Sequence, residues 1–136
     1  MNYGGEYIYD VLSNDSAVTD IVGTFTDDAG DTWPNIFGSR KVPQDKTSRE
    51  TINYYISSNF NAALNYFDIN FSIDCRAKSE YEAYDLADAV NDALNRKSAA
   101  AGGYIYFGTI SILLAIPPAD DADVYNVPVE INLRRK

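Results

Sequence analysis

One stretch of the sequence constrains the fold more than any other: a strand pattern at residues 67–76 runs directly into a helix pattern at residues 79–97. Apolar and polar residues alternate through the first segment, and a period of two is typical of a half-buried strand. In the second segment, apolar residues recur at helical spacing and acidic residues occupy the other face. The two patterns together predict a strand whose apolar side is covered by the following helix. The apolar sets are Phe67, Ile69, Phe71, Ile73 and Cys75 on the strand, and Ala83, Leu86, Ala87, Val90 and Leu94 on the helix.

The other regular patterns predict two short helices and three further strands. Residues 4–13 have a helical apolar face, and a second helix begins after the Asn14-Asp15-Ser16 cap and ends at Gly23. Strand composition is found at residues 51–60, 104–116 and 124–133. An antiparallel hairpin is the simplest pairing of the first of these strands with the strand at 67–76. We therefore expect a single α+β domain over residues 1–136, with an antiparallel sheet of about four strands and helices packed on one face.

Three segments interrupt these patterns. Residues 27–50 combine polar turn chemistry with Trp33-Pro34, and we expect a long extended loop here with room for no more than a short strand at Ile36-Phe37. Loops of this length are usually functional or disordered. The small residues at 98–103 predict a linker. Pro128 predicts that part of the last strand lies at a sheet edge, because proline lacks the N–H that pairs in a ladder.

Composition argues against catalysis and against nonspecific nucleic-acid binding. The formal net charge is −9, so the surface repels phosphate. The chain has no histidine, which removes the commonest general base and metal ligand. The aspartates at 27–31 and 120–123 lack the spacing of a calcium loop, and solvated turns are the preferred interpretation over cation sites. We expect no enzyme activity, no cofactor and no bound metal.

Two further features bear on partners. No segment approaches membrane-spanning length without polar residues, so we expect no membrane partner. The chain contains eleven tyrosines, which either contact other proteins or pave a β-rich core. The single cysteine, Cys75, falls on the apolar side of the central strand, where a buried and unreactive thiol is expected.

Candidate interface residues lie in the expected loop and at the C-terminal tail. Trp33 either anchors a partner or folds back onto the domain. The basic residues either contact an acidic partner or make the loop soluble. The full candidate set is Trp33, Phe37, Arg40, Lys41, Lys46, Arg49, Arg134 and Arg135.

Several stretches, taken together, resemble one protein family. Residues 7–23 are similar to a first helix, a short second helix and a glycine stop, and Val42-Pro43-Gln44 followed by residues 52–56 resembles a proline-glutamine loop that leads into a strand. Residues 71–77 and 81–94 resemble a strand that ends in a small residue, followed by an alanine-rich helix with paired carboxylates. This order resembles the tail-terminator (tail-completion) proteins of long-tailed bacteriophages, the family that includes the tail terminator of phage lambda.

The resemblance implies a structural virion protein assembled in the host cytoplasm. Such proteins form a homo-oligomeric ring, commonly a hexamer, that caps the tail tube and joins it to the head connector, while DNA passes through the lumen without specific binding. The tail tube protein and the head connector or neck protein are then the expected partners. A neighbouring head–tail connector or neck (head completion) protein is the alternative, and a small-ligand or metal-binding module is a third interpretation.

Overall fold

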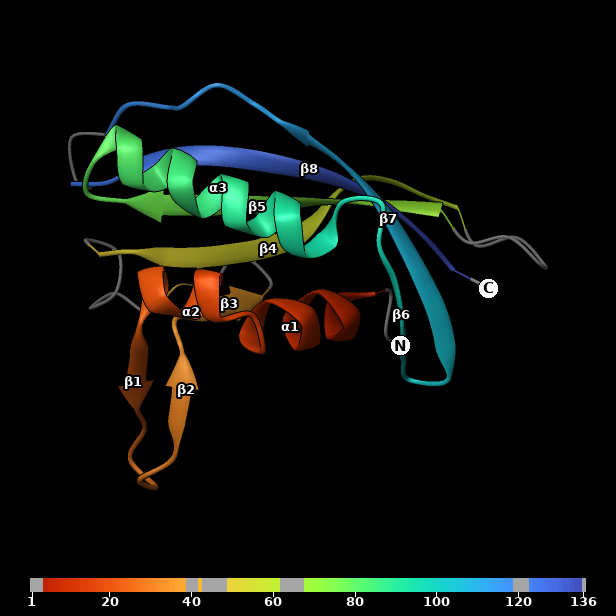
Figure 1. Cartoon of the computed structure of the whole chain (residues 1–136), viewed down its shortest axis with the longest axis horizontal. Coiled ribbons are helices and arrows are strands. Elements are labelled where there is room, and N and C mark those ends of the chain that lie inside the picture. Colours follow the sequence, from red (N-terminus) through yellow and green to blue (C-terminus); the bar gives the residue numbers. More distant parts are fainter. Residues whose placement is uncertain (1–3, 39–41, 43–48, 62–67, 119–122, 136) are drawn as a thin grey trace.

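The structure is a computed structural model, and it describes residues 4–38, 42, 49–61, 68–118 and 123–135 of the chain (Figure 1). Three helices and eight strands are present among these residues. The helices are α1 (Gly5–Ser13), α2 (Ser16–Val22) and α3 (Glu80–Leu94). The strands are β1 (Thr24–Thr26), β2 (Thr32–Pro34), β3 (Ile36–Gly38), β4 (Thr51–Asn61), β5 (Asp68–Ala77), β6 (Ser98–Ala101), β7 (Tyr104–Ile112) and β8 (Tyr125–Arg135). The expected α+β class is confirmed.

The main sheet is built around β5. Its strand order is β3-β4-β5-β8-β7-β6, and every neighbouring pair is antiparallel except β3 with β4, which is parallel. β5 pairs with β4 on one side and β8 on the other, so that Ile73 lies opposite both Tyr54 and Val129. The expected hairpin between residues 51–60 and the central strand is therefore confirmed.

The expectation of about four strands was wrong, because the sheet has six. One additional strand is β6, which lies where the small residues at 98–103 predicted a linker. Its alanines are too small to show an alternating pattern, yet Ala99 pairs with Tyr106 on β7. Gly102 and Gly103 form the turn, with φ angles of 57° and 86° that suit a tight two-residue hairpin connection. The other additional strand is β3, and it lies where the sequence analysis allowed no more than a short strand at Ile36-Phe37.

Part of the expected loop at 27–50 is also regular structure. Within its described portion, β1 and β2 pair as an antiparallel hairpin, and β3 joins the main sheet beside β4. Three-residue strands carry too few alternating positions to be recognised from composition. The parallel partner of β3 lies across a long connection in the sequence, so local pattern could not identify it.

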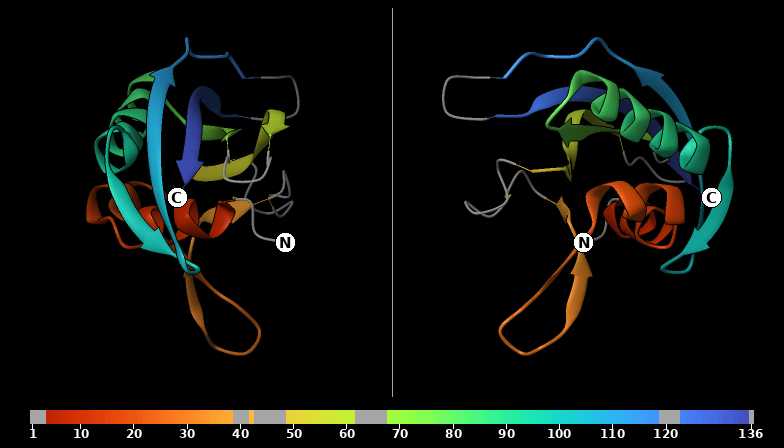
Figure 2. Two further views of the ribbon diagram at one scale, coloured as in Figure 1. Left: turned by 90° about the vertical axis from the view of Figure 1, so that its right-hand side faces the viewer. Right: turned by 60° about the vertical axis from the view of Figure 1, so that its left-hand side comes forward.

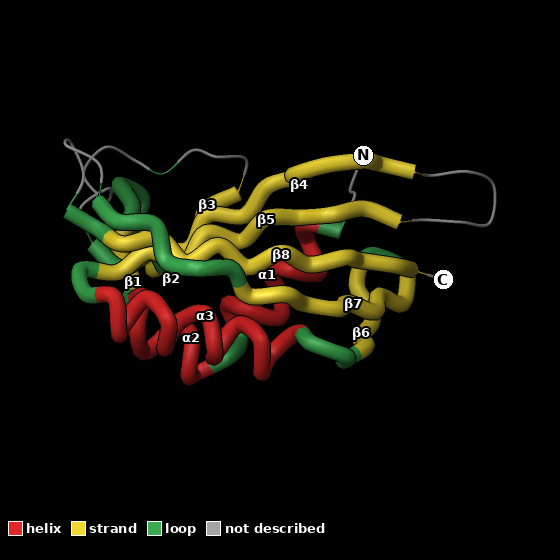
Figure 3. The backbone as a smooth tube through the Cα atoms, turned by 90° about the horizontal axis from the view of Figure 1, so that it is seen from above, coloured by secondary structure: helices red, strands yellow, loops and turns green. Residues whose placement is uncertain are grey.

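The three helices cover one face of the sheet (Figure 3). Of the residues predicted to face the helix, Ile69, Phe71, Ile73 and Cys75 on β5 are buried, and Phe67 lies outside the described residues. From α3, the side chains of Ala83, Leu86, Ala87, Val90 and Leu94 pack against them. Tyr7 of α1 stacks on Tyr106 of β7 with ring centroids 5.1 Å apart, which joins the first helix to the part of the sheet near the β6 edge.

Side-chain caps begin two of the helices. The Asp15 carboxylate accepts a hydrogen bond from Val18 N at 3.1 Å, which confirms the cap expected at the start of the second helix. At the start of α3, Ser79 Oγ accepts from Glu82 N at 3.1 Å. Each cap satisfies an amide that the first helical turn leaves without a partner.

β8 lies between β5 and β7, but the β7 ladder pairs only with Val129–Arg135, so the part of β8 that contains Pro128 has β5 as its only strand neighbour, as predicted. The carbonyl oxygen of Pro128 accepts a hydrogen bond from Leu113 N at 2.9 Å, so it faces the segment that follows β7. The ring nitrogen of Pro128 faces this same segment, because the nitrogen and the carbonyl of one strand residue point to the same side. The β7 ladder stops at Ile112, and pairing resumes only at Ile116 with Asn126. The proline therefore lies where the ladder is interrupted, and its missing N–H costs the sheet little.

Candidate interaction surfaces

The hairpin of β1 and β2, residues Thr24–Pro34, projects from one end of the domain and is called the arm below (Figure 1, Figure 2). Asp27 organises its turn: Oδ1 accepts from Ala29 N at 3.0 Å and from Asp31 N at 2.9 Å. Oδ2 accepts from Trp33 Nε1 at 2.8 Å. These bonds, the one from Trp33 foremost, lower the pKa of the Asp27 carboxyl. The turn is thus held in one conformation by its own side chains.

The base of the arm is fixed to the body by a small hydrogen-bond cluster. Val22 O accepts from Asn35 Nδ2 at 2.9 Å and from Arg49 Nη2 at 2.8 Å. Asn35 N donates to Gly23 O at 3.0 Å. Gly23 has a φ of 69°, which favours glycine, and a Cβ there would lie 2.9 Å from Arg49 Nη2, so that a side chain would displace this guanidinium.

The structure divides the predicted interface residues between two regions. Trp33 lies on the arm and is 43% exposed. Phe37 stacks on Phe25 at 5.7 Å between centroids, and together with Arg49 it supports the base of the arm. Arg134 and Arg135 lie at the other end of the domain, where β8 finishes. The candidates Arg40, Lys41 and Lys46 lie outside the described residues.

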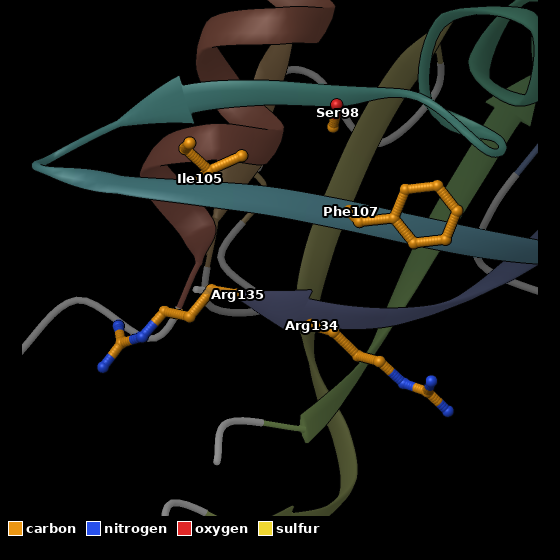
Figure 4. Close-up of a pocket in the computed structure, with 5 residues that line it drawn as sticks. All are labelled: Ser98, Ile105, Phe107, Arg134 and Arg135. Atoms are coloured by element: carbon orange, nitrogen blue, oxygen red, sulfur yellow. The ribbon is translucent and has the colours of Figure 1, made fainter. Parts of the chain in front are cut away.

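A groove of about 430 Å³ lies at that second end and is called the end groove below (Figure 4). Ile105 and Phe107 on β7 are exposed and give it an apolar surface, with Arg134 at its rim. The guanidinium carbon of Arg135 lies 3.8 Å from the ring centroid of Tyr104, a cation–π contact that orients this side chain. The residues that line the groove are Ser98, Ile105, Phe107, Arg134 and Arg135.

A third surface was missed by the sequence analysis. Ile112, Leu113, Leu114 and Ile116 are all exposed, Leu114 by 83%, and we call them the apolar ridge. Ala115 N donates to the Tyr84 hydroxyl at 2.9 Å, which holds this segment beside α3. The available signal was the unbroken apolar run at residues 112–116, because consecutive apolar residues on an extended chain cannot all face one core. Exposed apolar patches of this kind usually mark contact sites.

The outward face of α3 is acidic, as its sequence pattern predicted. Glu80, Asp85, Asp88 and Asp92 are exposed along it. Near its start, the Glu82 carboxyl lies against that of Glu50, which itself accepts from Lys78 N at 3.2 Å. Partial desolvation, the hydrogen bond with Glu50 and the charge of that residue raise the pKa of Glu82.

The Glu82→Gln variant is expected to change how stability depends on pH. Because the pKa of Glu82 is higher in the native state than in the unfolded state, the native state binds this proton more tightly. Wild-type stability should therefore rise as pH falls through the raised pKa, and the variant should lose that part of the rise. The effect should stay below about 1 kcal/mol, since solvent still reaches and screens this partly buried pair. Thermal unfolding over a pH series measures it, with Asp92→Asn as the control, and parallel curves for Glu82→Gln and wild type would contradict it.

Among the described residues, no three His, Cys, Asp or Glu side chains lie close enough together to hold a metal ion. Cys75 is fully buried, and burial raises the pKa of its thiol. Of the two expected aspartate turns, the one at 27–31 is organised by Asp27 as described above, and the one at 120–123 lies almost wholly outside the described residues. The described helices include none with the length and apolar character needed to cross a membrane.

Comparison with known proteins gives a likeness of fold. No protein-family model matches the sequence, and no curated protein matches it. Among solved structures, a chain from "Virion of native gene transfer agent (GTA) particle" aligns with a TM-score of 0.64 and 16% sequence identity. The alignment covers 94% of this chain and 90% of that chain. The shared fold therefore extends over nearly the full length of both.

Proposed function

We propose that this chain is a structural virion protein of a tailed bacteriophage, and specifically a tail terminator that forms a ring. The single observation that carries the proposal is the fold shared, over nearly its whole length, with a chain of a gene transfer agent virion. The stretches that resemble the tail-terminator family support it: most of them lie on α1, α2, β4, β5 and α3 of that fold, while Pro43-Gln44 lies outside the described residues. The ring would cap the finished tail tube and join it to the head connector.

The distribution of exposed surfaces supports a ring. A closed ring of identical copies needs two different surfaces that fit one another, one on each side of every subunit. This domain has the arm at one end and the end groove at the other, and the apolar ridge leaves further area for contact (Figure 1). We expect six copies, in line with the family that the sequence resembles.

The charge of the chain supports a passage for DNA rather than a binding site. With a net charge of −9 per copy and a row of carboxylates along α3, a ring of these subunits would be strongly acidic. An acidic wall repels the phosphate backbone, so that DNA moves past without adhering. In this role the protein needs neither a cofactor nor a catalytic centre.

Electron microscopy of negatively stained protein tests the proposal, with and without added tail tubes. We expect rings of about tube diameter in the protein alone or at one end of each tube, and tubes that stop growing once capped. A protein that stays monomeric in both conditions would contradict the proposed ring. Rings that bind isolated head connectors but never tail tubes would instead identify a neck protein.

A further inference from the structure

The arm presents an acidic and aromatic surface that its own subunit does not cover. Its residues 24–34 contain three aspartates and neither lysine nor arginine. Of these, Asp28 and Asp31 are exposed at the tip, beside the exposed ring of Trp33. A two-stranded hairpin gains little stability by itself in water. Its internal hydrogen bonds nevertheless hold the turn in one conformation, so little conformational entropy remains to be lost when a partner binds.

The end groove has the opposite character. Figure 4 shows Ile105 and Phe107 spaced along β7, and Arg134 and Arg135 at the end of β8 with their guanidinium groups extending away from β7 in different directions. Two further basic residues lie near β6 and β7. Arg96 N donates a hydrogen bond to Gly108 O of β7 at 2.8 Å, and Lys97 directly precedes β6. Both Arg96 and Lys97 are exposed. An apolar surface with a cationic rim suits an aromatic ring flanked by carboxylates.

These two surfaces match each other in chemistry and lie in opposite halves of the domain along its long axis, and the arm and the β6–β7 hairpin project to the same side of that axis (Figure 1). We propose that the arm of one copy docks into the end groove of the next copy, with Trp33 on Ile105 and Phe107, and Asp28 and Asp31 facing Arg134. This inference rests on the proposed ring and names the contact that would close it. The occupant of the groove is thus a second copy of this chain.

Size and residue type agree with this contact. The groove volume of about 430 Å³ leaves room for one large aromatic side chain together with a turn backbone. Tryptophan and arginine are the residues that most often dominate the energy of an interface, especially where a ring fills an apolar pocket. A guanidinium group at the rim adds a cation–π or ion-pair contact, depending on which side chain it meets. The contact is head to tail, so each added copy leaves one arm and one groove available until the ring closes.

Two single variants test the contact from its two sides. Trp33→Ala alters the arm and Ile105→Asp alters the groove. Each should remain folded, because both side chains are exposed. Each should weaken self-association by roughly 30-fold or more, the loss typical of a central aromatic contact. Sedimentation velocity over a concentration series measures this, and Tyr81→Ala, which removes an exposed ring elsewhere, is the matched control.

Mixing the two variants distinguishes a head-to-tail contact from other arrangements. A copy altered only in its arm still has an intact groove, and a copy altered only in its groove still has an intact arm. An equimolar mixture should therefore form dimers through the one intact contact and stop there. Dimers in the mixture, with monomers in each variant alone, support the proposal. Rings that persist in either variant alone, or a mixture that stays monomeric, would overturn it.

Charge exchange tests the polar part of the contact. Asp31→Lys should weaken association more at low salt than at high salt, and the second change Arg134→Glu should restore it within the double variant. Asp20→Lys, the same charge change on α2, should have no such effect. Absence of any restoration would overturn the pairing of Asp31 with Arg134.

The outcomes separate this inference from the proposed function. Rings formed equally by wild type and by both variants would overturn the arm–groove contact and leave the ring in place. Wild-type protein that remains monomeric at high concentration would also overturn the contact, while the experiment with tail tubes decides the proposed function separately. Rings that survive in Ile105→Asp but no longer bind tubes would assign the groove to the tube protein.

Discussion

The Ile73→Asp variant should fail to fold. Ile73 is completely buried at the centre of β5, between Tyr54 and Val129 on the neighbouring strands and beneath α3. An aspartate there would remove a charge from water without any partner, at a cost of several kcal/mol. Since the net stability of a domain is only about 5–15 kcal/mol, one such change consumes much of it. Far-UV circular dichroism and the soluble fraction after expression measure the loss.

The matched control is Ile105→Asp, the same substitution on another strand of the same sheet. Ile105 is 53% exposed, so its aspartate stays hydrated and the fold should persist. The difference between the two variants isolates burial from any effect of aspartate on strand formation. A soluble and cooperatively folded Ile73→Asp protein would show that the helix-covered face of β5 is not the core.

The Tyr7→Ala variant should lose about 3–5 kcal/mol of unfolding free energy, as for other large aromatic residues removed from a core. Tyr7 is 1% exposed and stacks on Tyr106, so its removal leaves a cavity between α1 and β7. This contact joins the first helix to the part of the sheet near the C-terminus. Chemical denaturation followed by circular dichroism measures the change.

Two variants bracket this result. Tyr7→Phe keeps the ring and removes only the hydroxyl, which donates to Lys97 O over a long 3.5 Å, so its loss should be near 1 kcal/mol or less. Tyr81→Ala removes a ring that is 87% exposed and should change stability by no more than about 0.5 kcal/mol. Equal losses in Tyr7→Ala and Tyr81→Ala would contradict the packing described for α1.

The core of the fold was predictable because its signals are local. Ile69 to Cys75 alternate within one strand, and Leu86, Val90 and Leu94 recur within one helix, so each element identifies its own buried face. The long hairpin partners were predictable for the same reason, since β4 and β5 follow one another in the chain. The short strands β3 and β6 were not predictable, because three or four residues are too few to show a period of two.

The candidate surfaces were predictable only in part. Trp33 and Arg134 were selected as individual residues of a type common at interfaces, and both are exposed. The end groove, by contrast, combines Ser98 of β6, Ile105 of β7 and Arg134 of β8. Those residues meet only because the sheet order places β7 between β8 and β6, and local composition does not contain that order. The support that Arg49 gives to the arm likewise depends on a hydrogen bond across 27 positions of the chain.

The hydrogen bond between the Trp33 indole and Asp27 has a practical consequence. The chain contains a single tryptophan, so tryptophan fluorescence, excited at a wavelength where tyrosine does not absorb, reports the environment of this hairpin alone. A solvent-facing indole emits at long wavelength and is readily quenched by acrylamide, a neutral quencher that the neighbouring aspartates do not repel, whereas a covered one emits further to the blue and is protected. Spectroscopy without any attached dye can therefore follow the average fraction of copies in which that side chain is covered by a partner.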